Sequence, residues 1–189
     1  MSWCAFVDES ESNRKLDPDV YILVASIMAS DIRESVREVM ACLRLPGEHK
    51  VHWYHESDKR RRILIETVIS LEVLHLAVVR TGAVGETSER RRRKCMERLF
   101  FELSAMGAHK IIFEAREARQ SRNDLNLVKA LRSRREIHAD IRVDHLSGPR
   151  EPLLWIPDLV AGAVVAARCG DRSYLDQIAP LVTVCVVEA

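Results

Sequence analysis

Short apolar runs rich in β-branched residues alternate with longer amphipathic stretches along this chain. A short apolar run bounded by polar residues is typical of a β-strand. We therefore expect strands at 3–8, 21–29, 73–81, 110–113, 141–144 and 181–187. The first of these runs ends in an acidic cluster from Asp8 to Glu11, which we expect to open a polar loop that continues to Pro18.

Apolar residues at three- and four-residue spacing predict helices between most of these strands. Ser30 or Asp31 can cap the first helix, and Pro46 helps to stop it. Further helices are expected from 57, from 87 or 88 to 106, and at 124–135, 152–169 and 171–178, with an extended piece at 49–55 and a loop at 116–122. Strands that first follow each other and then alternate with helices indicate an α/β fold, with a mixed β-sheet flanked by helices.

The size and composition favour one ordinary globular domain. The chain has 189 residues, so a single domain over 1–189 is expected. Its 47% hydrophobic and 30% charged residues exclude a disordered or low-complexity protein. The longest apolar stretch, 153–167, is short and is interrupted by Pro157 and Asp158, so we expect no membrane span. The N-terminus lacks a basic region followed by an apolar core, and we predict a cytoplasmic protein.

The net charge of +1 conceals two basic runs, 60–62 and 90–94. Consecutive charges point around a helix axis, and Glu89 and Glu97 can pair with them, so we expect solvated helix faces. Phosphate binding is the alternative. The five cysteines are scattered and form no CxxC pair, which argues against a disulfide framework or a structural zinc site and favours buried thiols.

Two aspartates stand among apolar residues. Alternation along the first strand places Asp8 on the same face as Cys4 and Phe6, near the carboxyl end of the strand, where α/β proteins collect ligands. Asp158 is the one charged residue in 153–167, on an apolar helix face beside the small Gly162. A buried carboxylate needs a partner or a metal, so an ion pair, for instance to an arginine, is the alternative to a functional role.

Glu114 ends the 110–113 strand and is the third candidate, although Glu117 is a nearby alternative. If Asp8, Glu114 and Asp158 converge, their charges repel unless a cation neutralises them. Oxygen ligands of this kind suit Mg²⁺ or Mn²⁺, and two such ions can activate a water and stabilise the leaving oxygen of a phosphodiester. The three carboxylates are therefore the predicted metal ligands.

His52 is a fourth candidate. In an extended segment it shares a face with Lys50, and it could shuttle a proton or bind phosphate. A structural role beside Trp53 is equally open. A zinc site from His49, His52 and His55 is conceivable, but the spacing matches no standard motif. We find no nucleotide-binding glycine motif and no serine nucleophile elbow.

Three segments together resemble the bacterial domain of unknown function 3800. They are Phe6-Val7-Asp8-Glu9-Ser10 with the following strand, Lys50-Val51-His52-Trp53, and the block from Glu151 to Gly162 that contains Asp158-Leu159-Val160-Ala161-Gly162. The resemblance implies a ribonuclease H-like fold and a metal-dependent nuclease. By resemblance, Asp8 and Asp158 match the acidic residues of the first strand and the last helix, and Glu114 stands near the position of the fourth-strand acid.

Glu9 and His52 also match recurring positions of that family, which makes them candidates to orient the water or the phosphate. Two departures from the family pattern stand out: Glu11 replaces a usual glycine, and Trp155-Ile156-Pro157 replaces Gln-x-Ala. They indicate either a subfamily or a lost activity.

The first hypothesis is a Mg²⁺- or Mn²⁺-dependent nuclease acting on RNA or DNA, with Asp8, Glu9, His52, Glu114 and Asp158 as catalytic candidates. The second is a catalytically inactive module that binds nucleic acid or a protein. A hydrolase of small phosphate esters is the third. A protein partner or a homo-oligomer stays open.

Overall fold

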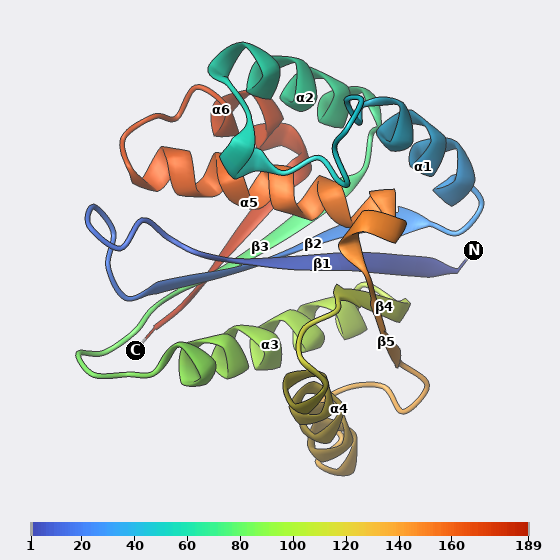
Figure 1. The fold of residues 1–189 in the computed structure, drawn as a ribbon. Helices are drawn as coiled ribbons and strands as arrows, with labels where there is room; N and C mark the ends of the chain where they lie inside the picture. Colours follow the sequence, from blue (N-terminus) through green and yellow to red (C-terminus); the bar gives the residue numbers. More distant parts are fainter. Residues whose placement is uncertain (1, 189) are drawn as a thin grey trace.

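The computed structural model describes residues 2–188, which build a six-stranded sheet in the order β5-β4-β1-β2-β3-β6 (Figure 1). The strands are β1 (Trp3–Glu11), β2 (Val20–Ala29), β3 (Leu74–Thr81), β4 (Ala108–Glu114), β5 (Arg142–Leu146) and β6 (Val182–Val187). The predicted mixed α/β sheet flanked by helices is confirmed.

The directions of the strands bring the carboxyl ends of three strands to one edge of the sheet. β2 is antiparallel to β1 and to β3, whereas β4 is parallel to both β1 and β5. The carboxyl ends of β1, β4 and β5 therefore meet at one edge, where side chains from separate segments can converge. β2 is buried almost throughout because both sheet faces are covered, which explains its nearly continuous apolar sequence.

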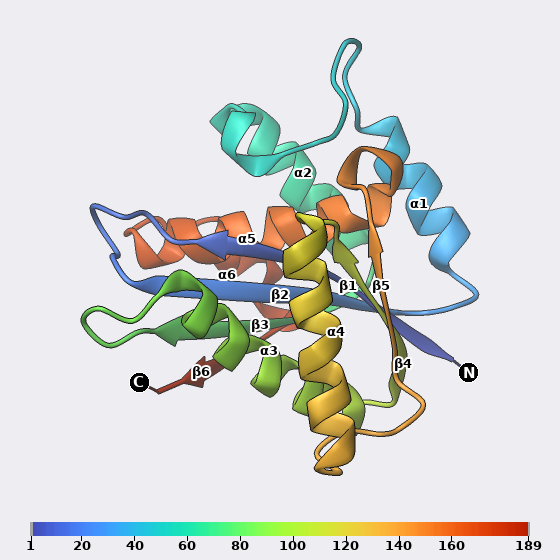
Figure 2. The ribbon, with the colours of Figure 1, turned by 60° about the horizontal axis from the view of Figure 1, so that its bottom comes forward.

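The helices form two layers, one on each face of the sheet (Figures 1 and 2). One layer contains α1 (Arg33–Cys42), α2 (Asp58–Ser70), α5 (Trp155–Arg168) and the short α6 (Leu175–Ile178); the other contains α3 (Ser88–Ala105) and α4 (Ala118–Ser133). Alternation along the strands sends one set of apolar side chains to each layer, so there are two cores.

Capping residues start two of these helices where the sequence predicts. Ser57 precedes α2, and its side chain accepts a hydrogen bond from the Arg60 backbone N–H at 3.3 Å. Thr87 caps α3 in the same way through the Arg90 N–H, also at 3.3 Å. These side chains satisfy N–H groups that have no partner inside the helix.

Several predicted details were wrong. β1 continues to Glu11, so the acidic cluster lies within a strand rather than opening a loop. α4 begins at Ala118, so the predicted loop at 116–122 is largely helical. The segment 49–55 is not one extended piece: His49 and Lys50 form a bend, His52 has an extended backbone, and Trp53–His55 forms a 3₁₀ turn. Cys42 is exposed, contrary to the expectation of buried thiols.

Gly162 makes room for a ring rather than for the sheet. A Cβ atom on Gly162 would lie 2.1 Å from Cγ of Trp53, closer than two carbon atoms can approach. The Trp53 ring packs edge-on against Tyr174 with centroids 5.0 Å apart, and Arg61 lies 4.8 Å from the Trp53 centroid. The absence of a side chain at Gly162 thus lets the loop before α2 pack on α5.

Within residues 2–188, the structure contains no helix with both the length and the apolar character that crossing a membrane requires.

Gly162→Ala should destabilise the protein by about 1–3 kcal/mol, because the added methyl overpacks a filled core. Urea unfolding measures the loss. Trp53→Leu creates space at the same contact, so the double variant should lose less stability than the sum of the two single variants. Strict additivity of the two losses would show that Gly162 does not act through Trp53.

Candidate functional site

Asp8 and Glu114 lie side by side at the carboxyl edge of the sheet. Val7 pairs with Phe113 across the parallel β1 and β4, so the next residues of the two strands, Asp8 and Glu114, are neighbours. Both follow, by two positions, residues of the core under α5, namely Phe6 and Ile112. The two carboxylates therefore point to the face that α5 covers.

Asp158 comes to the same place from the first turn of α5. Its carboxylate is only 11% exposed. One oxygen lies 2.8 Å from Nδ1 of His52, and the other accepts the Trp53 backbone N–H at 2.8 Å. The predicted need for a partner is thus met by His52 and a peptide group rather than by an arginine.

Glu114 is held by a lysine. Nζ of Lys50 donates to both carboxylate oxygens of Glu114, at 2.8 and 3.0 Å. Gly148 lies against the same carboxylate, where a Cβ atom would be 2.2 Å from Oε1. Glu117, the alternative acid, is exposed beside the start of α4.

Lys50 and His52 belong to one segment that crosses the site between α1 and α2. Both side chains reach the carboxylates, so they share a face as the sequence predicts, although Lys50 lies in a bend and only His52 has an extended backbone. Sequence reasoning named His52 as a site residue but treated Lys50 only as its neighbour. The signal that could have identified Lys50 was its position two residues before His52.

Asp8 has no ion-pair partner within the described part of the chain. Burial, followed by the charges of Asp158 and Glu114, raises the pKa of the Asp8 carboxyl well above its usual range, and nearby Lys50 only partly offsets this. The three predicted carboxylates are therefore close enough to repel one another, which favours the protonated form of Asp8.

The bases of the site are stabilised in their charged forms. The hydrogen bond to Asp158 raises the pKa of His52 despite partial burial. Burial opposes the charge of Lys50, but hydrogen bonding and attraction to Glu114 outweigh it, so the pKa of Lys50 is raised. Both side chains thus supply positive charge to the carboxylate cluster.

Glu9 lies on the opposite face of the sheet, because it follows Asp8 in the same strand. Its carboxylate pairs with Arg92 of α3 and with Nε of Arg116, the latter at 3.1 Å. Arg92 also binds Asp124 of α4, and Nε2 of His145 lies 3.0 Å from that aspartate. The structure therefore brings four of the five predicted site residues together and leaves Glu9 in a separate ion-pair network.

The expectation of a solvated face for the basic run 90–94 was wrong for two of its residues. The Arg92 side chain is only 3% exposed, and Arg91 is also buried. The sequence spacing did not reveal this, because the acidic partners of both arginines, Asp19 for Arg91 and Asp124 for Arg92, come from distant segments.

A small crevice of about 180 Å³ opens between the ends of β1 and β4, lined in part by Asp8, Glu114 and Arg116. Sites that enclose small molecules usually have about 300–1,000 Å³. Among residues 2–188, no group of three His, Cys, Asp or Glu side chains is spaced to hold a metal ion as the side chains stand. His52 and His55 do lie close, with ring centroids 5.1 Å apart.

Comparisons with solved structures identify the architecture. RNase HII of Archaeoglobus fulgidus, solved in a complex with PCNA, aligns over 87% of this chain and 73% of its own, with a TM-score of 0.56 and 11% identity. Ribonuclease H2 of Pyrococcus horikoshii OT3 aligns over 88% and 73%, with a TM-score of 0.51 and 12% identity.

Bst-RNase HIII in complex with Mn²⁺ aligns over 88% of this chain at a TM-score of 0.55 and 12% identity, and this chain spans about half of its length, 53%. No family model and no curated protein matches the sequence. The fold is therefore ribonuclease H-like.

Asp8→Asn should stabilise the metal-free protein at neutral pH. The raised pKa of Asp8 means that its protonated form favours folding; this contribution is complete below the unfolded-state pKa and is lost as pH rises through the folded-state pKa. Asparagine carries no charge, so its advantage in urea unfolding should be larger at pH 8 than at pH 5.

The exposed Asp31→Asn is the matched control and should show no such pH-dependent gain. An Asp8→Asn variant that is equally or less stable than wild type at both pH values would contradict the repulsion described here.

Proposed function

We propose that this protein is a metal-dependent phosphodiesterase that cleaves RNA or DNA, with Asp8, Glu114 and Asp158 as the metal ligands. The observation that carries the proposal is the convergence of three carboxylates, from two adjacent strand ends and one helix. Burial, followed by the charges of Asp158 and Glu114, raises the pKa of Asp8 there. The ribonuclease H-like fold supports it.

The donor set fits a hard divalent cation. Carboxylate oxygens are the ligands that Mg²⁺ and Mn²⁺ prefer, and two positive charges would relieve the repulsion at Asp8. Lys50 now supplies one positive charge and occupies both oxygens of Glu114. A divalent ion would therefore compete with Lys50 for Glu114.

When bound, the cation would supply an activated water and stabilise charge on the phosphate oxygens. Asp158 holds His52 through Nδ1, which leaves Nε2 as the nitrogen that can exchange a proton with substrate. Its raised pKa keeps His52 protonated to higher pH, so it is suited to donate a proton to the leaving oxygen. Lys50, once released, can contact the phosphate.

The shape of the site favours a polymeric substrate. The crevice beside Asp8 and Glu114 is too small to enclose a nucleotide, and the carboxylates lie at an edge of the sheet. A nucleic-acid strand can instead lie across this edge. This argues against the hydrolase of small phosphate esters.

The finer assignments follow from the resemblance. The proposal also includes that this chain belongs to the family called bacterial domain of unknown function 3800. The role of Glu9 in catalysis stays a prediction, since its carboxylate is bound to Arg92 and Arg116 on the other face of the sheet. The cytoplasmic location also stays a prediction.

A catalytically inactive binding module is the second candidate. It is favoured by the protein donors that already occupy Glu114 and Asp158: Lys50 on one, and His52 with the Trp53 N–H on the other. In such a module Lys50 would replace the metal permanently.

Asp158→Asn should lower kcat for oligonucleotide cleavage in Mn²⁺ at least about a hundredfold, as expected for the loss of a charged group that stabilises the transition state. Asp140→Asn, on an aspartate whose side chain is 63% exposed, is the matched control and should retain activity. Thermal unfolding checks that both variants fold. Retained cleavage by a folded Asp158→Asn variant would refute the assignment.

Lys50→Met should tighten Mn²⁺ binding by about tenfold, or about 1.4 kcal/mol, because the competing ammonium is removed while the unbranched apolar part of the side chain is kept. Calorimetry measures the affinity without any turnover. Lys59→Met, on an exposed lysine of α2, should bind Mn²⁺ as wild type does. If neither wild type nor Lys50→Met binds Mn²⁺, the inactive module is the correct description.

A further inference from the structure

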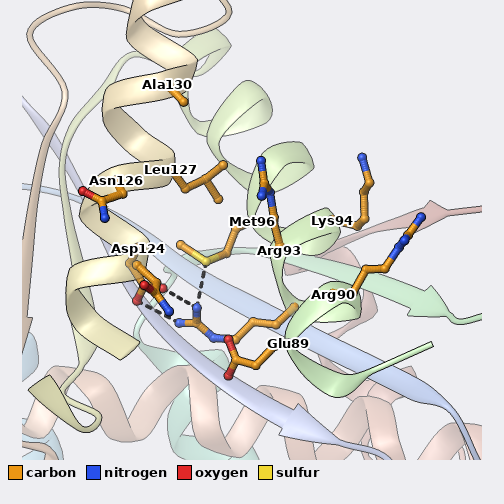
Figure 3. Close-up of a pocket in the computed structure, with 11 residues that line it drawn as sticks. Glu89, Arg90, Arg93, Lys94, Met96, Asp124, Asn126, Leu127 and Ala130 are labelled. Carbon is orange, nitrogen blue, oxygen red and sulfur yellow. Dashed lines mark hydrogen bonds and ion pairs between the residues drawn. The ribbon is translucent and has the colours of Figure 1, made fainter. Parts of the chain in front are cut away.

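A groove lies between α3 and α4 (Figure 3). Its volume is about 610 Å³, and it is on the sheet face opposite the carboxylates. Its polar walls include Arg90, Arg93 and Lys94 from α3, and Asn123 and Asn126 from α4. Its floor includes the apolar side chains of Met96, Leu127 and Ala130. The volume falls within the range of ligand-binding sites.

The α3 wall carries more positive than negative charge. The side chains of Arg90, Arg93 and Lys94 are 72%, 56% and 45% exposed. Arg93 and Lys94 share one acid, Glu97, at 3.3 and 2.9 Å. Glu86 is likewise shared between Arg90 and the buried Arg80. Each acid neutralises only one of its two cations. Glu89 also lines this wall, but it is paired with Arg116, so the exposed α3 wall keeps excess positive charge.

The α4 wall adds further positive charge. Arg119 and Arg122 precede Asn123 and Asn126 by four residues, which places them one helical turn away on the same side of α4. Both arginines are exposed, and neither forms an ion pair with any residue from 2 to 188. The groove is therefore flanked by unneutralised guanidinium groups.

The groove is connected to the carboxylate edge of the sheet. Arg92, which lines the groove, binds Glu9, the residue next to Asp8. Glu89 also lines the groove and pairs with Arg116, which lines the crevice beside Asp8 and Glu114. A chain molecule that leaves the carboxylates past Arg116 therefore meets the start of the groove.

We propose that this groove binds a single-stranded segment of nucleic acid that flanks the segment at the carboxylates. The proposal takes the class of ligand from the proposed function. The basic walls match a phosphate backbone, the two asparagine amides can hydrogen-bond base edges, and the apolar floor can contact a base or sugar. A duplex would keep its bases stacked inside and leave the floor unused.

Fluorescence anisotropy of labelled 15-mers of deoxythymidine and of uridine, in chelator, tests the proposal without turnover. Arg93→Gln with Lys94→Gln should weaken binding about tenfold. The slope of the logarithm of the binding constant against the logarithm of the salt concentration should become shallower by about 1.4, since each phosphate contact contributes about 0.7 in a single strand. The control pair, Lys110→Gln with Arg142→Gln, removes the same charge from exposed residues that pair at the amino ends of β4 and β5, away from the groove, and should bind within about twofold of wild type.

The proposal would be overturned if the two double variants lost equal affinity for the oligonucleotides, or if the groove variant lost none. It would also be overturned if polyglutamate of the same length competed as well as unlabelled oligonucleotide, because the site would then fit an acidic protein. Asp158→Asn separates the two proposals. Continued cleavage by this variant would refute the assignment of the carboxylates as the catalytic site, while selective loss of binding in the groove pair would still support the groove.

Discussion

Three carboxylates held in one buried place repel one another, and much of the local structure serves to limit that repulsion. Lys50 neutralises Glu114, and His52 and a peptide N–H bind Asp158. Asp8 forms no ion pair with any residue from 2 to 188, and burial together with the charges of Asp158 and Glu114 raises its pKa. Desolvated like charges are unstable without a counter-charge, and the proposed cation site rests on this unbalanced charge at Asp8.

The packing around the carboxylates depends on two glycines. Gly148 allows the chain after β5 to lie against Glu114, and Gly162 admits the ring of Trp53 against α5. The Trp53 N–H then reaches Asp158 at 2.8 Å, so the packing of the ring and the hydrogen bond at the site are parts of one contact. A change in core packing at α5 would therefore move the groups that bind the carboxylates.

The two-residue alternation of side chains along a strand explains the positions of both Asp8 and Glu9. Alternation places Asp8 with Phe6, and the apolar helix places Asp158 toward the sheet, so both positions follow from local pattern. The same alternation sends Glu9 to the other face, where Arg92 and Arg116 bind it. The resemblance had grouped Glu9 with Asp8, and only the geometry separates their surroundings.

Contacts between distant segments could not be predicted in this way. The pairing of Lys50 with Glu114 and the burial of Arg92 between Glu9 and Asp124 depend on how helices and strands assemble. The start of α4 at Ala118 was missed because residues 116–122 are polar and arginine-rich and lack an apolar stripe. A helix that packs mainly through its later turns shows its pattern only there.

The most direct test of the central claim, that the three carboxylates hold a divalent cation, is anomalous X-ray scattering from crystals soaked in Mn²⁺. We expect an anomalous peak among Asp8, Glu114 and Asp158, with the Lys50 amine displaced from Glu114. Absence of a peak at millimolar Mn²⁺, with Lys50 still bound to both oxygens of Glu114, would contradict the account and identify the lysine as the permanent cation of the site.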